Sequence, residues 1–263
     1  MELGLKGKVA LITGGSEGIG KAAGMSMAAE GAKVAICARR QDVLDQAVTE
    51  IREATGGEVL AISADVSDAA AVEATVARVV AEFGRLDILV NNAGASAAGP
   101  FESVTDEGWQ DDLDLKLFGA IRACRLALPH MRAQGGGRII NVTNLGAKAP
   151  GGASVPTSVS RAAGVALTKA MSKEYAADNI LVNTVCIGLI KSAQWERRYE
   201  LAHAKDANVT QDSIYTTMGA NVPLKRVGES EEAGDVIAFL ASERASYLTG
   251  IAVNIDGGTS PVV

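Results

Sequence analysis

Short apolar runs rich in β-branched residues alternate with longer amphipathic segments, and this alternation constrains the fold more than any other feature. Most of the runs are apolar at consecutive positions, which is typical of strands buried on both faces. Strand–helix–strand repetition predicts a parallel sheet with right-handed crossovers. We therefore expect one α/β domain over residues 1–263, with a doubly wound, seven-stranded parallel sheet and helices on both faces. The expected strands begin at Lys8, Lys33, Val59, Leu86, Arg138, Ile180 and Ile251.

The segments between the expected strands carry helical periodicity, with two long helices predicted from Thr105 to Arg132 and from Ser158 to Ala177. One irregular stretch, at about 190–228, is too long for a tight connection and contains several aromatic residues. We interpret it as a substrate lid over a pocket. The alternative is a surface excursion that only packs on a partner subunit.

Composition excludes several classes of function. The formal net charge is −6 and no long run of Lys or Arg occurs, so a nucleic-acid partner is not expected. The N-terminus does not resemble a signal peptide, and no apolar stretch is long enough to span a bilayer. Cys37, Cys124 and Cys186 lack metal-ligand spacing, so we expect reduced packing residues, no metal and a cytoplasmic location.

Glycine and polar motifs follow six of the expected strands, where an open parallel sheet binds its ligands. The motifs are Thr13–Gly20, Arg39–Arg40, Asp65–Val66, Asn91–Gly94, Asn144 and Gly188. In the first motif, Gly14, Gly18 and Gly20 allow a sharp turn and a close approach to a pyrophosphate. The helix that follows points its amide-bearing end at that negative charge. These motifs predict a dinucleotide site along one edge of the sheet.

The pattern TGxxxGxG at 13–20, with NNAG at 91–94, resembles the short-chain dehydrogenase/reductase family. The resemblance runs nearly end to end, including VNTVCIG after the sixth expected strand and the closing YLTGIAVNIDGG. It implies a Rossmann-type fold, a nicotinamide cofactor, a small-molecule substrate and a homo-oligomer, with a tetramer favoured. The cofactor-binding residues that it implies are Gly14, Ser16, Gly18, Ile19, Gly20, Asp65, Val66, Asn91, Ala93, Gly94, Gly188 and Ser192.

The end of the second expected strand indicates which dinucleotide binds. NAD sites place a carboxylate there for the ribose hydroxyls, whereas NADP sites need positive charge for the 2′-phosphate. Here the chain has Arg39 and Arg40, and no acid before Asp42. Two guanidinium groups can hold a phosphate through paired hydrogen bonds, so we predict NADP. The alternative is an ordinary solvated surface pair.

The family's chemistry uses an Asn, a Ser and a Tyr-x-x-x-Lys pair, and this chain departs from the pattern at every one of these positions. The residues that occupy them are Lys116, Asn144, Thr157 and Arg161. No tyrosine occurs between Trp109 and Glu174. Tyr175 lies eighteen residues beyond Thr157, which is ~27 Å along a helix, so it cannot reach the same centre.

Lys116 and Arg161 bring two positive charges to the expected reaction centre of an acidic protein. Lys116 is a candidate acid/base or ribose ligand, because a lysine beside an arginine has a lowered pKa. The pair is also a candidate site for an anionic substrate or a developing oxyanion, and the third alternative is drift after catalysis was lost. Thr157 is no base near neutral pH, so we expect Lys116 to exchange the proton.

The favoured function is an NADP(H)-dependent oxidoreductase that moves a hydride between nicotinamide and a small carbonyl or alcohol, with a carboxylate-bearing substrate as one option. Two alternatives stay open. One is a non-redox enzyme on the same scaffold, such as a lyase, isomerase or hydratase. The other is a catalytically silent NADP(H)-binding protein.

Overall fold

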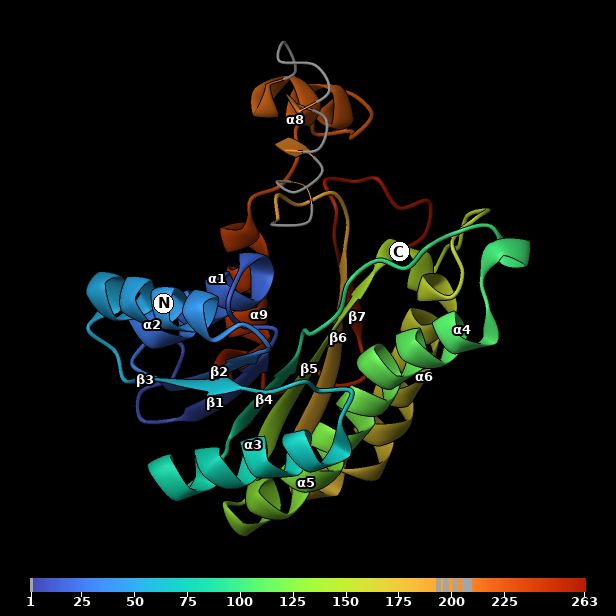
Figure 1. Ribbon diagram of the computed structural model, residues 1–263. Coiled ribbons are helices and arrows are strands. Elements are labelled where there is room, and N and C mark those ends of the chain that lie inside the picture. The colour runs from blue at the N-terminus through green and yellow to red at the C-terminus, as the bar shows by residue number, and fades with distance from the viewer. Residues whose placement is uncertain (1, 193–194, 196–198, 201–202, 205–209) are drawn as a thin grey trace.

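As predicted, the chain forms a seven-stranded, entirely parallel sheet, and its strands lie in the order β3-β2-β1-β4-β5-β6-β7 (Figure 1). The computed structural model describes residues 2–192, 195, 199–200, 203–204 and 210–263. The strands are β1 (Val9–Thr13), β2 (Lys33–Ala38), β3 (Val59–Ser63), β4 (Ile88–Asn91), β5 (Gly137–Asn144), β6 (Ile180–Ile187) and β7 (Ala252–Ile255). The order reverses direction between β1 and β4, which places a switch point at the carboxyl ends of these two strands.

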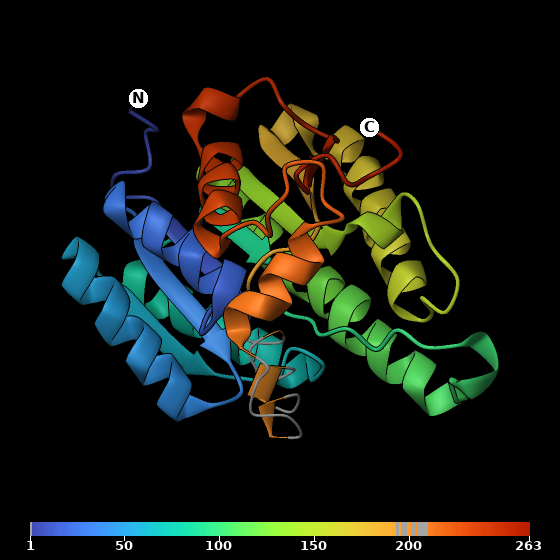
Figure 2. The same ribbon diagram turned by 90° about the horizontal axis from the view of Figure 1, so that it is seen from above.

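Helices cover both faces of the sheet (Figures 1 and 2). One layer contains α1 (Gly18–Ala29), α2 (Gln41–Thr55) and α9 (Ser230–Ala241), and the other contains α3 (Ala69–Phe83), α5 (Gly119–Ala133) and α6 (Thr157–Glu174). Successive residues of β1 enter different cores: Ala10 and Ile12 pack in one, and Val9 and Leu11 in the other. All four side chains are buried, which explains why the strand is apolar at consecutive positions.

The long helix expected from Thr105 to Arg132 is interrupted. It consists of α4 (Asp106–Leu113), a π-helical turn η2 (Asp114–Phe118) and α5, in direct succession. The Thr105 side chain accepts a hydrogen bond from the Gly108 N–H and caps the start of α4. Single π turns of this kind often occur at functional sites, and this one contains Lys116. The second long helix, α6, ends at Glu174, three residues before the expected end.

The excursion that we interpret as a lid leaves and rejoins the domain at one point. Ile190 and Gly228 form a parallel bridge, and the Gly228 N–H donates to the Leu189 carbonyl at 2.9 Å. Between them, α8 (Gln211–Gly219) stands away from the sheet, beyond its carboxyl edge (Figure 1). Part of the predicted lid (193–194, 196–198, 201–202 and 205–209) lies outside the described residues, and its role as a lid remains a prediction.

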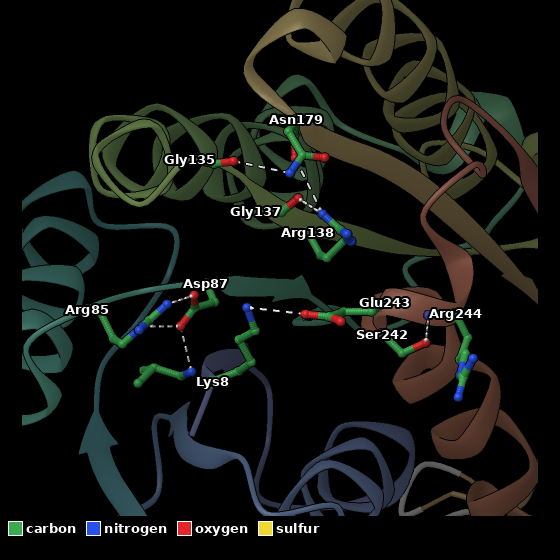
Figure 3. Close-up of polar contacts among 11 residues, drawn as sticks. Lys8, Arg85, Asp87, Gly135, Gly137, Arg138, Asn179, Ser242, Glu243 and Arg244 are labelled. Atoms are coloured by element: carbon green, nitrogen blue, oxygen red, sulfur yellow. Dashed lines mark hydrogen bonds and ion pairs between the residues drawn. The ribbon is translucent and has the colours of Figure 1, made fainter. Parts of the chain in front are cut away.

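The amino edge of the sheet also carries charged residues, but these are bonded to one another (Figure 3). The buried carboxylate of Asp87 accepts the Val9 N–H at 2.9 Å and two hydrogen bonds from the Arg85 guanidinium. Nearby, Lys8 Nζ lies 3.8 Å from a Glu243 carboxylate oxygen. These groups connect strands and helices, and the polar groups that face a cleft lie at the opposite edge.

Candidate active site

A cleft of about 750 Å³ runs along the carboxyl edge of the sheet, where the motifs predicted a ligand site. Fifteen of the eighteen residues predicted to bind cofactor or act in catalysis line it: Gly14, Ser16, Gly18, Ile19, Arg39, Arg40, Asp65, Val66, Ala93, Gly94, Asn144, Thr157, Arg161, Gly188 and Ser192. Gly20, Asn91 and Lys116 do not line it. One cleft therefore joins the expected cofactor residues to most of the expected catalytic ones.

The glycine-rich loop is held in shape by polar contacts from the end of β4. Gly14 has φ +64°, a conformation that L side chains rarely adopt. The Asn92 amide donates to the carbonyls of Thr13 (3.0 Å) and Gly14 (2.9 Å). A methyl group at Gly20 would overlap the Gly14 carbonyl, so this glycine permits close packing of the loop on α1 rather than ligand contact.

Asn91, one of the residues that the family resemblance implied for cofactor binding, instead lies in the core. It is buried, and its amide donates to Asn141 Oδ1 at 2.8 Å and to Cys124 Sγ at 3.3 Å. The next residue, Asn92, lines the cleft in its place. Side chains alternate between opposite faces along a strand, so a one-residue difference in register decides which asparagine faces the ligand.

The two arginines after β2 differ in their partners. Arg40 forms an ion pair with Glu17 of the glycine-rich loop. Arg39 is exposed, lines the cleft and makes no ion pair within the described part of the chain. Burial raises the pKa of the Asp65 carboxyl, but two hydrogen bonds from Ser67 and the charge of Arg39 outweigh burial and lower that pKa overall. Arg39 is thus the arginine whose charge is available to a bound anion.

Lys116 lies directly behind the cleft wall, in a buried polar network that the sequence analysis did not anticipate. Its ammonium group forms an ion pair with Asp112, and both side chains are only 1% exposed. It also donates to Thr157 Oγ1 at 2.9 Å. The Ser160 hydroxyl donates to the other oxygen of Asp112 at 2.6 Å. Thr157 belongs to this network and also lines the cleft.

Burial lowers the pKa of Lys116, and the charge of Arg161 acts in the same direction, while Asp112 opposes both. The direction agrees with the sequence prediction, but burial rather than Arg161 is its main cause. Asp112 was missed. Its position four residues before Lys116 in a predicted helix was the available signal, because such residues are neighbours on a helix surface.

Arg161 and Asn144 present unpaired polar atoms at the same end of the cleft. Arg161 donates from Nη1 to the Val142 carbonyl at 2.8 Å, and it has no ion pair among the described residues. Burial lowers the pKa of Arg161 to about 10, so the side chain stays positively charged at neutral pH. Arg161 Nε and Asn144 Oδ1 are buried without a hydrogen-bond partner in the described structure. Buried polar atoms of this kind favour a ligand that satisfies them.

Gly94 explains how the two basic side chains fit together. A methyl group there would overlap Arg161 Nη2 and lie 3.3 Å from Lys116 Cγ. The absence of a side chain at Gly94 therefore leaves room for the Lys116 and Arg161 side chains beside the cleft wall.

Other residue types are remote from the cleft or buried. Tyr175 caps the far end of α6 and stacks on Arg132, with the guanidinium 5.2 Å from the ring centroid. The three cysteines are buried and unpaired, and burial raises the pKa of Cys37 and Cys124 to about 12, as expected of packing residues. The described residues contain no group of three or more acidic, His or Cys side chains placed to hold a metal, and no described helix is long and apolar enough to cross a membrane.

The fold and the cleft are those of a dinucleotide-binding α/β protein, and comparison with known proteins places the chain more narrowly. The family model described as enoyl-(acyl carrier protein) reductase matches residues 14–260. Oxidoreductase UcpA of Salmonella typhimurium is 35% identical over 260 residues, which is 97% of this chain and 95% of that protein.

Two solved structures are similar over nearly the whole chain. L-sorbose reductase from Gluconobacter frateurii, complexed with NADPH and L-sorbose, is 36% identical with a TM-score of 0.95 and complete coverage of both chains. An NADPH-bound short chain oxidoreductase from Pseudomonas aeruginosa PAO1, described as containing an atypical catalytic center, is also 36% identical. Its TM-score is 0.89, with coverage of 97% of this chain and 98% of that one. The chain belongs to the short-chain dehydrogenase/reductase family of oxidoreductases.

Proposed function

We propose that this protein is an NADP(H)-dependent oxidoreductase that transfers a hydride to or from a small carbonyl or alcohol, with an unusual acid/base group. The observation that carries this proposal is the composition of the cleft. At one end lie the glycine-rich loop and Arg39, and at the other lie Thr157, Asn144 and Arg161. The glycine-rich loop and the arginine at the first end suit a dinucleotide, and the polar side chains at the second end suit a polar substrate.

The residues present fit NADP(H) on three counts. The loop from Gly14 to Gly20 leads into the amino end of α1, which favours a pyrophosphate. The charge of Arg39, which has no ion pair among the described residues, favours the 2′-phosphate. The unpaired Nε of Arg161 offers a donor near the inner end of the cleft. Both solved relatives named above hold NADPH, which supports the same choice here. When bound, NADPH supplies the hydride.

The chain's own residues then orient the substrate and move the proton. Arg161 holds a substrate oxygen through its guanidinium, and a carboxylate-bearing substrate gains most because this cation has no ion pair among the described residues. Asn144 offers a buried acceptor for a substrate hydroxyl. Lys116 exchanges the proton, since it is the member of the group whose lowered pKa suits proton transfer.

A cofactor screen followed by a substrate screen tests the proposal. Calorimetric titration should show NADPH binding at least tenfold tighter than NADH. NADPH oxidation should then be followed by spectrophotometry against matched pairs of 2-oxo acids and neutral ketones. Turnover with oxo acids above ketones supports the whole proposal. Tight NADPH binding without turnover across the panel would favour the silent binding protein.

A non-redox enzyme is the second candidate, and the observation that favours it is that Arg161 has no ion pair among the described residues. A buried cation beside an amide can polarise a carbonyl or hold an oxyanion without any hydride transfer. Turnover of a substrate in the absence of NADP(H) would select this candidate.

We further propose a cytoplasmic homo-oligomer, with a tetramer favoured. Phe118 in η2 and Val159 in α6 are 39% and 46% exposed, so apolar side chains of this helical layer face outward in the single chain. Light scattering at micromolar concentration tests the assembly, and a monomer would contradict it.

A further inference from the structure

The Thr157 hydroxyl is the point at which the buried network meets the cleft. Thr157 lines the cleft, whereas Lys116 and Asp112 do not. A substrate bound in the cleft would therefore not touch Lys116 directly. The polar contact that joins Lys116 to a cleft residue is its 2.9 Å hydrogen bond to Thr157 Oγ1.

The hydrogen bonds around Thr157 determine which way its own proton can point. A hydroxyl has two acceptor lone pairs and one donor hydrogen. Both lone pairs are engaged, one by the Ala97 N–H at 3.0 Å and the other by Lys116 Nζ. The hydroxyl hydrogen must therefore go to another acceptor. Asp112 Oδ1 is 3.4 Å away, which is a long and weak hydrogen bond for a hydroxyl.

We propose that the Thr157 hydroxyl is a proton relay between buried Lys116 and the substrate oxygen, with Asp112 as the residue that positions Lys116. This inference rests on the proposed redox function and extends it. In carbonyl reduction, Thr157 gives its hydroxyl proton to the oxygen that the hydride transfer leaves negative. Lys116 gives a proton to Thr157 Oγ1 at the same time, so that no threonine alkoxide forms.

The step balances, and it reverses for alcohol oxidation. The new O–H bond on the product uses the Thr157 proton, and the O–H bond on Thr157 is renewed from the Lys116 ammonium, which becomes a neutral amine. After the product leaves, a cleft water returns a proton along the same path. Asp112 takes no part in the transfer, and the Ser160 hydroxyl donates to its second oxygen at 2.6 Å.

This relay changes the expectation drawn from the sequence, which gave Thr157 no part in proton transfer. A threonine cannot act as a base alone near neutral pH. It can conduct a proton when it receives one as it gives one away. Thr157 should therefore matter as much as Lys116, and the two should act as a unit.

A double-mutant cycle in the full-length protein tests the relay once a carbonyl substrate is found. Thr157→Val and Lys116→Met should each lower turnover by on the order of a hundredfold, and the double variant should be no worse than either single one. Thr157→Ser keeps the hydroxyl and should retain turnover within about tenfold of the parent. Ser160→Ala removes a buried hydrogen bond to Asp112 without interrupting the path, and should cost far less than Thr157→Val.

Turnover near the parental level in Thr157→Val, with a large loss in Lys116→Met, would overturn the relay, as would losses that multiply in the double variant. A second readout does not depend on turnover. The ¹³Cε resonance of Lys116, assigned by its loss in Lys116→Met, should titrate at a lower pH than exposed lysines. Its midpoint should fall further in Thr157→Val, because the ammonium loses an acceptor.

An unchanged midpoint in Thr157→Val would also overturn the relay. If no carbonyl in the panel is reduced, the proposed function fails, and the titration still decides whether Thr157 and Lys116 are coupled. Asp112→Asn provides the test of positioning. It should lower the Lys116 midpoint, and a midpoint equal to the parent's would contradict the positioning role.

Discussion

The two ends of the cleft are built in opposite ways. At the cofactor end, glycines bring backbone to the surface, and the charge of Arg39 is exposed and unpaired within the described structure. At the catalytic end, Lys116 and Asp112 are buried and do not line the cleft, and they meet it through their partner Thr157, which does. The cofactor end therefore has a positive charge that a bound anion can pair with. At the second end Lys116 is paired with Asp112 in the interior, while Arg161 has no ion pair among the described residues, so this end depends on the buried pair for both stability and chemistry.

The largest expected effect is on stability, at the catalytic end. Asp112→Ala leaves the Lys116 ammonium buried without its counter-ion, and should lower the free energy of unfolding by about 3–5 kcal/mol. Urea unfolding measures this. The matched control is Glu58→Ala, which breaks the exposed pair between Lys33 and Glu58 and should cost about 0–1 kcal/mol. Equal losses would show that the pair at 112 and 116 is solvated in solution.

The second expected effect separates the two ends by function. Lys116→Met should lower turnover by on the order of a hundredfold or more and change the dissociation constant of NADPH by less than about threefold. The physical reason is that Lys116 does not line the cleft and lies on the path of the proton. Steady-state kinetics and calorimetry on the same preparation measure both quantities. A large loss of NADPH affinity would assign Lys116 to the cofactor instead.

The pH dependence of turnover sharpens this assignment. Burial and Arg161 lower the pKa of Lys116 below the usual 10.5. Reduction needs the protonated lysine, so its rate should fall as the pH rises through that lowered pKa, while the rate of alcohol oxidation should rise. Profiles of kcat/KM in both directions measure the midpoint. A profile of kcat/KM that does not change with pH in either direction would exclude Lys116 as the group that exchanges the proton.

The sequence predicted the cofactor end better than the catalytic end, for a physical reason. The sharp turn after β1 depends on local residues such as Gly14 and Gly18, which adopt positive φ. The motif alone therefore predicts the shape of this loop. The parallel sheet and the shared edge of the motifs followed from the strand–helix alternation. Asn92 lines the cleft and Asn91 does not. Predicting this would have required the register of β4, which a sequence motif does not specify.

The catalytic network depends on contacts between distant segments. Ser160 and Thr157 lie in α6, more than forty residues from Asp112, and they meet it because α6 packs against α4 and the π turn that follows it. A continuous helix was expected there. The positions of Lys116 and Arg161 in the family pattern predicted that both lie near the reaction centre. The burial of Lys116 behind Thr157 could be found only from the structure.

A smaller effect is expected at the cofactor end. Arg39→Ala should reduce the preference for NADPH over NADH by about tenfold, because the phosphate loses a charge-assisted hydrogen bond worth roughly 1.5–3 kcal/mol. Arg40→Ala should reduce it less, since Arg40 already pairs with Glu17. Competition titrations with both dinucleotides measure the ratio. An unchanged ratio in the Arg39→Ala/Arg40→Ala variant would show that both arginines only face solvent.

The smallest expected effect concerns Glu17, an acid at the edge of the phosphate end. Its carboxylate neutralises Arg40 in the structure, and it would face the incoming 2′-phosphate as a like charge. Glu17→Gln keeps the shape, releases the Arg40 guanidinium and removes the repulsion. Pairs as exposed as this one are worth about 0–1 kcal/mol, so NADPH affinity should rise by a few fold at most, and NADH affinity should stay constant.

Salt provides the control for the Glu17 prediction. The gain in NADPH affinity should be largest near 10 mM salt and should shrink at 0.5 M, because the charges at this end are exposed and screened. The additional substitution Arg40→Ala should abolish most of the gain if Glu17 acts by occupying Arg40. A gain that persists in that double variant would mean that Glu17 repels the phosphate directly. A loss of affinity in Glu17→Gln would show that the carboxylate supports the glycine-rich loop instead of opposing the ligand.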